Sequence, residues 1–370
     1  MKHTKHLLCL ILSAIISCGF CGCNEKKAGS DYASLSEIYA HADEVLEESF
    51  QNMEMPEQIL LDQPQSLYTI PLDHTPIDKT NPAVLREFVK SMVSNYETGC
   101  EQIYEDEDNR YVFYESDQLY AEAFENGSEL LMVRSGMQYY LNVGQLQKCW
   151  HLTRPEFDKQ ERCMLNGTEY TISSLLDSMD TAVKKSVLPF SANKEARAKT
   201  AGIYLLSDQT QQFVVEYEYM VNGLPIDNMA GGLGTTDESH CMVKMSFVAA
   251  MTNPDQLALL RTESGWPLKE PTKLEDRFLT LSAALRLTED YLAPEHVYQV
   301  NDIEMRYVCI TDPQTEQYTF RPCWHIIMDE QHGEHMMNVA VSVYIDMQDG
   351  RICIEDTING SRTDFSQYDS

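Results

Sequence analysis

Apolar residues recur every three or four positions in four stretches of the chain, a spacing that predicts amphipathic helices. These stretches cover residues 35–52, 81–96, 172–185 and 279–292. Pro82 supports the second helix, because proline fits the first turn of a helix. Residues 55–80 contain four prolines, so we expect an extended connection there instead of a helix.

Between the helices, runs of aromatic and β-branched residues are separated by Asn-Gly, Asp-Gly and other turn residues, which predicts antiparallel strands. A first group of strands is expected over 110–115, 118–125, 129–134 and 137–143. A meander follows each of the two later helices, over 202–207, 212–221 and 242–251 and then over 300–311, 318–328, 339–346 and 351–356. The pattern predicts an α+β fold with tandem helix-plus-antiparallel-meander domains behind a smaller N-terminal part.

The first residues have the pattern of an export signal, with a basic start and an apolar run over 7–16 that is too short to cross a bilayer of roughly 30 Å. Residues 20–23 read Phe-Cys-Gly-Cys, and a polar stretch follows. This segment resembles the lipobox of bacterial lipoproteins, which implies that Cys23 is lipidated and becomes the first residue of the mature chain. Residues 15–18 form an alternative box that would place the lipid on Cys18. A conventional cleaved signal peptide without a lipid is the third interpretation.

The expected organisation follows from these signals. It comprises a signal peptide over 1–22, a flexible tether over 23–34, an N-terminal α+β region over 35–160, and helix-plus-meander domains over 161–270 and 271–370. No later stretch reaches the 18 apolar residues that a second membrane segment needs.

The chain is strongly acidic, with a formal net charge of −30. Removing the leader takes away Lys2 and Lys5 but no acidic residue, so 26 basic residues remain against 58 acidic ones and the charge becomes −32. Such a surface repels phosphate, which argues against nucleic-acid binding. It also repels anionic lipid heads, so we expect the N-terminal lipid alone to hold the protein on the extracellular face of the cell membrane.

Short hairpin signals recur in the second half of the chain. Residues 217–226 contain an Asn-Gly turn, residues 322–327 read Pro-Cys-Trp-His-Ile-Ile, and residues 343–352 contain an Asp-Gly turn. These phrases resemble the modules of PepSY-type and YycH/YycI-type extracytoplasmic proteins of Gram-positive bacteria. The resemblance covers about residues 165–356 and implies a cystatin-like scaffold that binds, inhibits or regulates a membrane partner. The chain departs from the YycH/YycI architecture in using a lipid anchor instead of a transmembrane helix.

Few residues suggest specific chemistry. His332 and His335, with His325 before them, have the spacing of weak metal ligands, although a solvated hairpin loop explains the same residues. A glycine-rich segment, whose members are Gly231, Gly232 and Gly234, lacks the lysine and hydroxyl residue of a phosphate loop and is interpreted as a connector or binding loop. Trp266, in a turn, is a weak candidate for ligand stacking, whereas Trp324 lies in an apolar strand and is expected in the core. The acidic run over 101–108 lacks the glycine of a calcium loop and is interpreted as a solvated turn.

Neither the cysteines nor a search for catalytic motifs identifies a functional site. Seven cysteines follow Cys23, an odd number without CxxC spacing, and Cys149–Cys163 is the first disulfide to test. Cys309, Cys323 and Cys353 are expected to be small buried residues on strands. No motif for nucleophilic catalysis occurs, so no catalytic residue and no cofactor are assigned.

The sequence therefore favours a lipid-anchored extracytoplasmic protein that binds or regulates a cell-surface protein or a wall component, without catalysis. A hydrolase with a dispersed site is one alternative. A solute-binding lipoprotein is the other, and it would require a deep pocket between the two domains.

Overall fold

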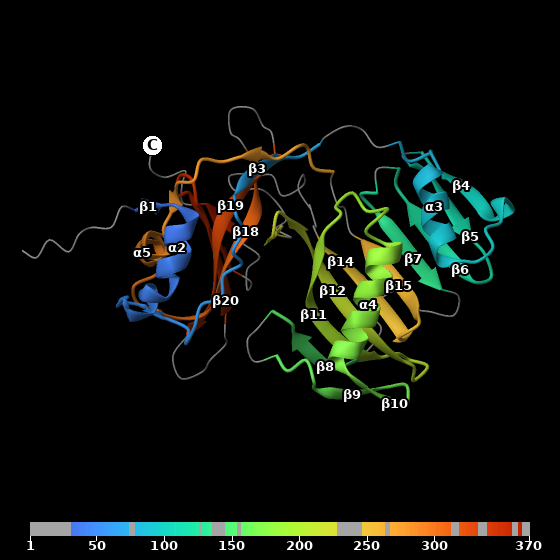
Figure 1. The fold of residues 1–370 in the computed structure, drawn as a ribbon, viewed down its shortest axis with the longest axis horizontal. Coiled ribbons are helices and arrows are strands. Elements are labelled where there is room, and N and C mark those ends of the chain that lie inside the picture. The colour runs from blue at the N-terminus through green and yellow to red at the C-terminus, as the bar shows by residue number, and fades with distance from the viewer. Residues whose placement is uncertain are drawn as a thin grey trace, which may run out of the picture.

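The computed structural model describes residues 31–73, 78–107, 109–125, 127–134, 145–153, 157–227, 246–262, 267–311, 318–331, 339–356 and 362–364. Two antiparallel sheets lie side by side, and each has helices packed on one face (Figure 1). The predicted α+β class is confirmed.

The first sheet has ten strands in the order β4-β5-β6-β7-β15-β14-β12-β11-β8, with β13 paired to β12. Its strands are β4 (Glu101–Glu105), β5 (Arg110–Glu115), β6 (Leu119–Ala123), β7 (Leu130–Arg134), β8 (Gln145–His151), β11 (Ala196–Leu205), β12 (Gln211–Val221), β13 (Leu224–Pro225), β14 (Ser246–Asn253) and β15 (Gln256–Thr262). A separate hairpin of β9 (Arg162–Leu165) and β10 (Thr168–Thr171) precedes the main helix.

Helix α4 (Ile172–Ser186) packs against β12, β14 and β15 of this sheet. Thr171 caps the helix by accepting a hydrogen bond from the backbone N–H of Ser174 at 3.3 Å. The apolar residues that predicted the helix form one buried face: Ile172, Leu175, Met179 and Val183. Burying four such side chains stabilises the fold by about 2 kcal/mol each, so the spacing of apolar residues determines how α4 sits on the sheet.

Helix α3 (Ala83–Met92) covers β5 and β6 on the same sheet, with Leu85, Phe88 and Val89 buried. It ends at Met92, four residues earlier than the sequence predicted, and a 3₁₀ turn η2 (Thr98–Cys100) leads into β4. The acidic run was wrongly interpreted as a turn, since its residues 101–105 form β4 at the edge of the sheet. Pairing of β4 with β5 along five residues accounts for the extended conformation.

The second sheet has eight strands in the order β16-β3-β19-β20-β21-β22, with β18 paired to β19 and to β2. Its strands are β2 (Met53–Glu54), β3 (Tyr68–Pro71), β16 (Thr272–Lys273), β18 (Val297–Thr311), β19 (Tyr318–Gln331), β20 (Val339–Asp346), β21 (Ile352–Asp356) and β22 (Arg362–Asp364).

Helix α5 (Leu281–Tyr291), helix α2 (Leu35–His41) and the 3₁₀ helix η1 (Ala42–Glu47) lie on the side of the second sheet that faces away from the first (Figure 1). The helix expected over 35–52 thus changes to 3₁₀ geometry at Ala42. Trp324 is fully buried, as predicted, and its indole N–H donates to the carbonyl of Leu279 at 2.9 Å. A two-residue ladder joins β1 (Tyr32–Ala33) to β17 (Phe278–Leu279) just before α5.

The region expected as an N-terminal part, 35–160, is divided between both sheets. Strands β4 to β8 join the first sheet, whereas β2 and β3 join the second. The connection over 55–80 is extended where the structure describes it and contains β3, as the prolines indicated. The chain therefore crosses between the sheets several times, and the two sheets form one contiguous hydrophobic core.

Across the described ranges, the longest helix has 15 residues, and no helix is long and apolar enough to cross a membrane.

Candidate binding cleft

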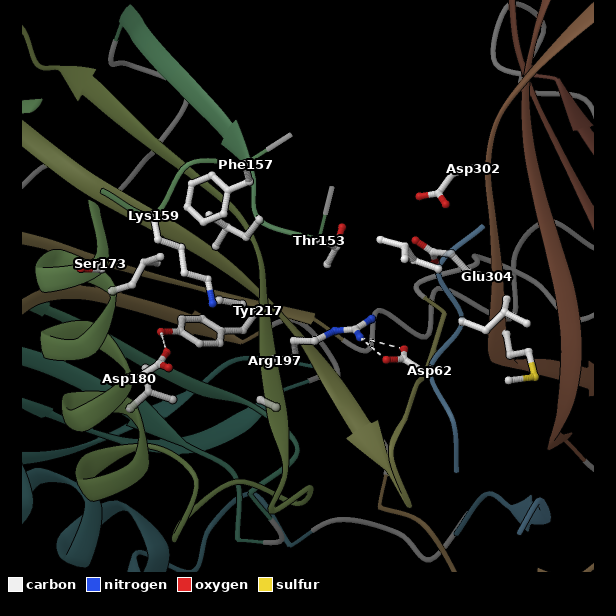
Figure 2. Close-up of a pocket in the computed structure, with 18 of the residues that line it drawn as sticks. Asp62, Thr153, Phe157, Lys159, Ser173, Asp180, Arg197, Tyr217, Asp302 and Glu304 are labelled. Carbon is white, nitrogen blue, oxygen red and sulfur yellow. Dashed lines mark hydrogen bonds and ion pairs between the residues drawn. The ribbon is translucent and has the colours of Figure 1, made fainter. Parts of the chain in front are cut away.

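A cleft of about 780 Å³ lies between the two sheets. The connection over 56–62 borders it, α4 and the segments before it form one wall, and residues 301–305 of β18 form the other. In Figure 2, Asp302 and Glu304 lie on the β18 side, Tyr217, Asp180 and Lys159 lie on the opposite side, and Arg197 and Asp62 lie between them. The cleft is therefore built from segments far apart in the sequence.

Arg197 of β11 is the central charged group of the cleft. Its guanidinium donates to both carboxylate oxygens of Asp62, at 2.9 and 2.7 Å, and to Glu218 of β12 at 2.7 and 3.0 Å. Burial alone would lower the pKa of Arg197, but the two carboxylates outweigh it and raise the pKa. Arg197 is thus held as a cation that protein groups already neutralise.

Glu218 also connects the two sheets. Its second carboxylate oxygen accepts from Arg306 of β18 at 2.9 Å, and the two side chains are only 1% and 3% exposed. Arg306 donates in addition to Glu304. Burial would lower the pKa of Arg306, but the carboxylates of Glu304, Asp227 and Glu218 raise it. These ion pairs form a chain from the rim of the cleft into the junction of the sheets. We call this chain the inter-sheet network, and its members are Asp62, Arg197, Glu218, Arg306 and Glu304.

A backbone contact reinforces this junction. The N–H of Asp227, just after β13, donates to the carbonyl of Tyr307 at 2.8 Å, and Ile226 forms a parallel bridge to the same residue. The middle of β18 is thus held against the first sheet by both main chain and charged side chains.

Asp302 lies at the cleft without a cationic partner. Its carboxylate accepts from the N–H of Ile303 at 2.9 Å, and no described Lys, Arg or His lies within 4 Å of it. Burial raises the pKa of Asp302, and the adjacent charge of Glu304 raises it further. For Glu304, burial would raise the pKa, but His325 and Arg306 lower it well below its usual range. Asp302 is therefore the carboxylate in this pair that forms no ion pair with a described Lys or Arg, although the nearby His325 acts to lower its pKa.

His325 lies behind this acidic pair. It stands opposite Glu304 in the pairing of β18 with β19, and its Nδ1 is 3.9 Å from Glu304 Oε2. Its ring is 94% buried and stacks on Tyr344 with centroids 4.3 Å apart, and neither ring nitrogen has a described hydrogen-bond partner. No group of three or more metal-type ligands occurs among the described residues.

The wall formed by α4 combines polar and apolar groups. Tyr217 of β12 donates to Asp180 of α4 at 2.7 Å and stacks on Phe247 with centroids 4.8 Å apart. Burial raises the pKa of Tyr217, and Asp180 raises it further. Lys159 is exposed at this end, and no described acceptor lies within hydrogen-bond distance of its ammonium group.

The residues that line the cleft carry more acid than base. Six acidic residues face three basic ones: Glu57, Asp62, Asp177, Asp180, Asp302 and Glu304 against Lys159, Lys184 and Arg197. Apolar side chains, among them Leu61, Leu152 and Phe157, also line the cleft. An arrangement of this kind binds a ligand that has charged ends and an apolar body.

Most residues proposed from the sequence lie elsewhere. Cys18, Cys23, His332, His335 and Trp266 are outside the described residues. The same is true of the glycine-rich segment: Gly231, Gly232 and Gly234.

The cysteine predictions have mixed outcomes. Cys149 and Cys163 are free thiols, so the disulfide between them is not formed. Trp150 is buried beside Glu161, to which its indole donates, and its neighbour Cys149 is therefore turned to the opposite face of β8. Cys309 and Cys323 are buried on strands, as predicted.

A second surface feature is an aromatic strip on the outer face of β4, β5 and β6. Its rings follow one another with centroid separations of 5.0, 6.1 and 5.5 Å in the order Tyr104, Tyr111, Phe113 and Tyr120. Tyr104 is 42% exposed, whereas Tyr114 points to the other face and is buried. The alternation of side chains along β5 thus places the strip on one face.

The sequence analysis did not predict the cleft. One feature of β18 could have indicated the inter-sheet network. Asp302, Glu304 and Arg306 alternate along a strand that is otherwise largely apolar, so three charged side chains share one face. Charged residues that alternate within a buried strand need partners, and this signal could have identified the network.

No family model matches the chain, and no curated protein matches its sequence. Among solved structures, the crystal structure of an uncharacterized protein from Eubacterium rectale ATCC 33656 is similar, with a TM-score of 0.53 and 13% sequence identity. The match covers 85% of this chain and 98% of that one. At this level of identity the likeness shows a shared fold, and the function has to be inferred from the site itself.

Proposed function

We propose that this chain is a lipid-anchored extracytoplasmic binding protein, without catalytic activity, whose ligand occupies the cleft between the two sheets. The observation that carries the proposal is the cleft itself, a cavity of about 780 Å³ lined by charged groups, several of which, Asp302 and Lys159 among them, form no ion pair with another described residue. Its volume lies within the range of small-molecule and peptide sites, roughly 300–1,000 Å³. A deep pocket between the two units is the feature that the solute-binding alternative required.

The inter-sheet network supports binding to a preformed cleft. Arg197, Glu218 and Arg306 hold the walls at a fixed separation, so the ligand does not have to order them. Preorganisation of this kind increases affinity by reducing the conformational cost of binding.

The leader supports the proposed location. Two long acyl chains on Cys23 would contribute roughly 0.8 kcal/mol for each buried methylene, which makes attachment effectively permanent. A Cys23→Ser variant should therefore be released from the membrane fraction, whereas Cys18→Ser should stay there. Release of Cys18→Ser instead would move the anchor to the alternative box, and retention of both variants together with the double variant would refute the anchor.

Photocrosslinking in the native cell tests the cleft. A benzophenone amino acid replaces Phe157, which lines the cleft, and in a matched variant it replaces Tyr170 of β10, which does not. After irradiation the protein is purified and its intact mass is measured. A defined adduct at Phe157 that is missing at Tyr170 supports the proposal, and identical adduct patterns at both positions overturn it.

The aromatic strip favours a second candidate function, the regulation of a cell-surface protein through the outer face of β4, β5 and β6. Neighbouring aromatic rings on a partly exposed sheet face are typical of protein-contact surfaces. A Tyr104→Ser/Tyr111→Ser variant should then lose crosslinks to a defined membrane protein while the adduct at Phe157 persists. Unchanged crosslinking in that variant would remove this candidate.

A further inference from the structure

Building on the proposed function, we infer that the ligand of the cleft is a short peptide with free ends, bound with its N-terminal ammonium at Asp302 and its C-terminal carboxylate at Lys159. The inference starts from two charged groups of opposite sign that lie on opposite sides of the cleft (Figure 2). Neither has an oppositely charged partner among the described residues. A ligand that carries both charges would satisfy both groups at once.

The acidic end attracts a cation strongly. Asp302 and Glu304 occupy alternate positions on one face of β18, and only Glu304 is neutralised, by Arg306. Burial and the charge of Glu304 both raise the pKa of Asp302, so an ammonium group beside it would stabilise its ionised form. His325 lies behind this end, with its Nδ1 3.9 Å from Glu304 Oε2, and acts to lower the pKa of both carboxylates.

The central arginine does not compete for the carboxylate of the ligand. Arg197 already donates four hydrogen bonds to Asp62 and Glu218. The ammonium groups of Lys159 and Lys184 have no ion pair with another described residue, and we assign the ligand carboxylate to Lys159, which lies across the cleft from Asp302 in Figure 2.

The space between the ends suits a peptide body. Leu61, Leu152 and Phe157 line the same cleft and offer apolar contacts to a peptide body, and Met305 adds another from β18. A cavity of this volume admits a few residues in extended form, whereas a folded domain does not enter it.

Calorimetry with four forms of one tetrapeptide, Ala-Leu-Leu-Ala, tests the inference on the full-length mature protein. The peptide is used with free ends, N-acetylated, C-amidated and blocked at both ends. We expect acetylation and amidation each to weaken binding by about tenfold, because each removes one charge-assisted contact.

Isosteric variants assign these losses to residues. In Asp302→Asn, acetylation should weaken binding by less than about threefold, and in Lys159→Gln the same should hold for amidation. Two exposed residues outside the cleft provide controls, Asp255→Asn and Lys185→Gln, which should behave as wild type. Thermal unfolding verifies that each variant is folded.

The outcomes separate this inference from the proposed function. Equal binding of all four peptides would refute the charged-end recognition and leave the cleft as a binding site. Binding by none of them at millimolar concentration would refute the peptide assignment, and the adduct at Phe157 would then decide independently whether the cleft binds any ligand.

Discussion

The inter-sheet network gives the sharpest test of how the molecule is held together. Arg306 is 3% exposed and pairs with Glu218 and Glu304, so the Arg306→Met variant leaves two carboxylates without their shared cation. Removing one partner of a buried ion pair typically costs 3–5 kcal/mol, because the remaining charge stays buried. Glu218 keeps its bonds to Arg197, so we expect the lower end, about 3 kcal/mol, and a fall in melting temperature of about 4 °C.

Tryptophan fluorescence during urea unfolding measures both sheets. Trp150 is buried on the first sheet and Trp324 on the second, so in a Trp266→Phe background the variants with one of these two also replaced by Phe report each sheet separately. With Arg306 in place, both probes should show the same transition. In Arg306→Met the midpoints should fall and separate, because the link between the sheets is weakened.

A matched control uses an exposed ion pair. Arg162 and Glu169 pair across the β9–β10 hairpin with side chains that are 70% and 54% exposed. Arg162→Met should change the free energy of unfolding by less than about 1 kcal/mol. If Arg306→Met is tolerated as well as this control, the network does not stabilise the junction and the reasoning is wrong.

Two further predictions concern pH and backbone strain. Burial raises the pKa of Asp346 to about 6, above its unfolded value of roughly 3.9, so its contribution to stability is fully present below pH 4 and is lost as the pH rises through 6. Asp346→Asn should therefore flatten the dependence of the unfolding free energy on pH between 4 and 7, and urea titrations that gave an unchanged slope would contradict this. Gly127 has φ +68°, and a Cβ there would lie 1.9 Å from the carbonyl oxygen of Phe190, so Gly127→Ala should cost more than about 2 kcal/mol. Gly223→Ala at φ +85° meets only Pro64 at 3.9 Å and should cost less, and equal losses in calorimetric melting would show that the close approach is unimportant.

Local signals in the sequence predicted individual helices and hairpin turns because the determinants of these elements are local. The apolar spacing of α4 and α5 and the turns that follow their strands depend on neighbouring residues. Gly167, Gly223 and Gly350 all have positive φ values, as their turns require. Short-range periodicity was thus sufficient for these helices and hairpins, whereas strands such as β9, β10 and β15 were not predicted.

The assembly of the sheets depends on contacts that sequence periodicity does not encode. Strand β7 pairs with β15 in a register that places Val133 opposite Leu259, more than a hundred residues away. Both strands are apolar enough to pair with several others, so no local pattern selects this partner. The cleft was missed for the same reason, since Asp62, Arg197 and Arg306 meet only after the sheets have formed.

The short ladder between β1 and β17 limits how far the protein can stand from the bilayer. The N–H of Thr280 donates to the carbonyl of Asp31 at 2.8 Å, which fixes the chain to the second unit from residue 31 onward. If the lipid is on Cys23, as proposed, residues 24–30 link it to the folded part, and seven residues span about 25 Å at most. Anionic headgroups repel the negatively charged folded part within a Debye length of about 8 Å. We therefore expect the folded part to lie between about 8 and about 25 Å from the bilayer surface. If the lipid is on Cys23 and the cleft binds a ligand, as proposed, that ligand has to diffuse to this layer outside the lipid surface.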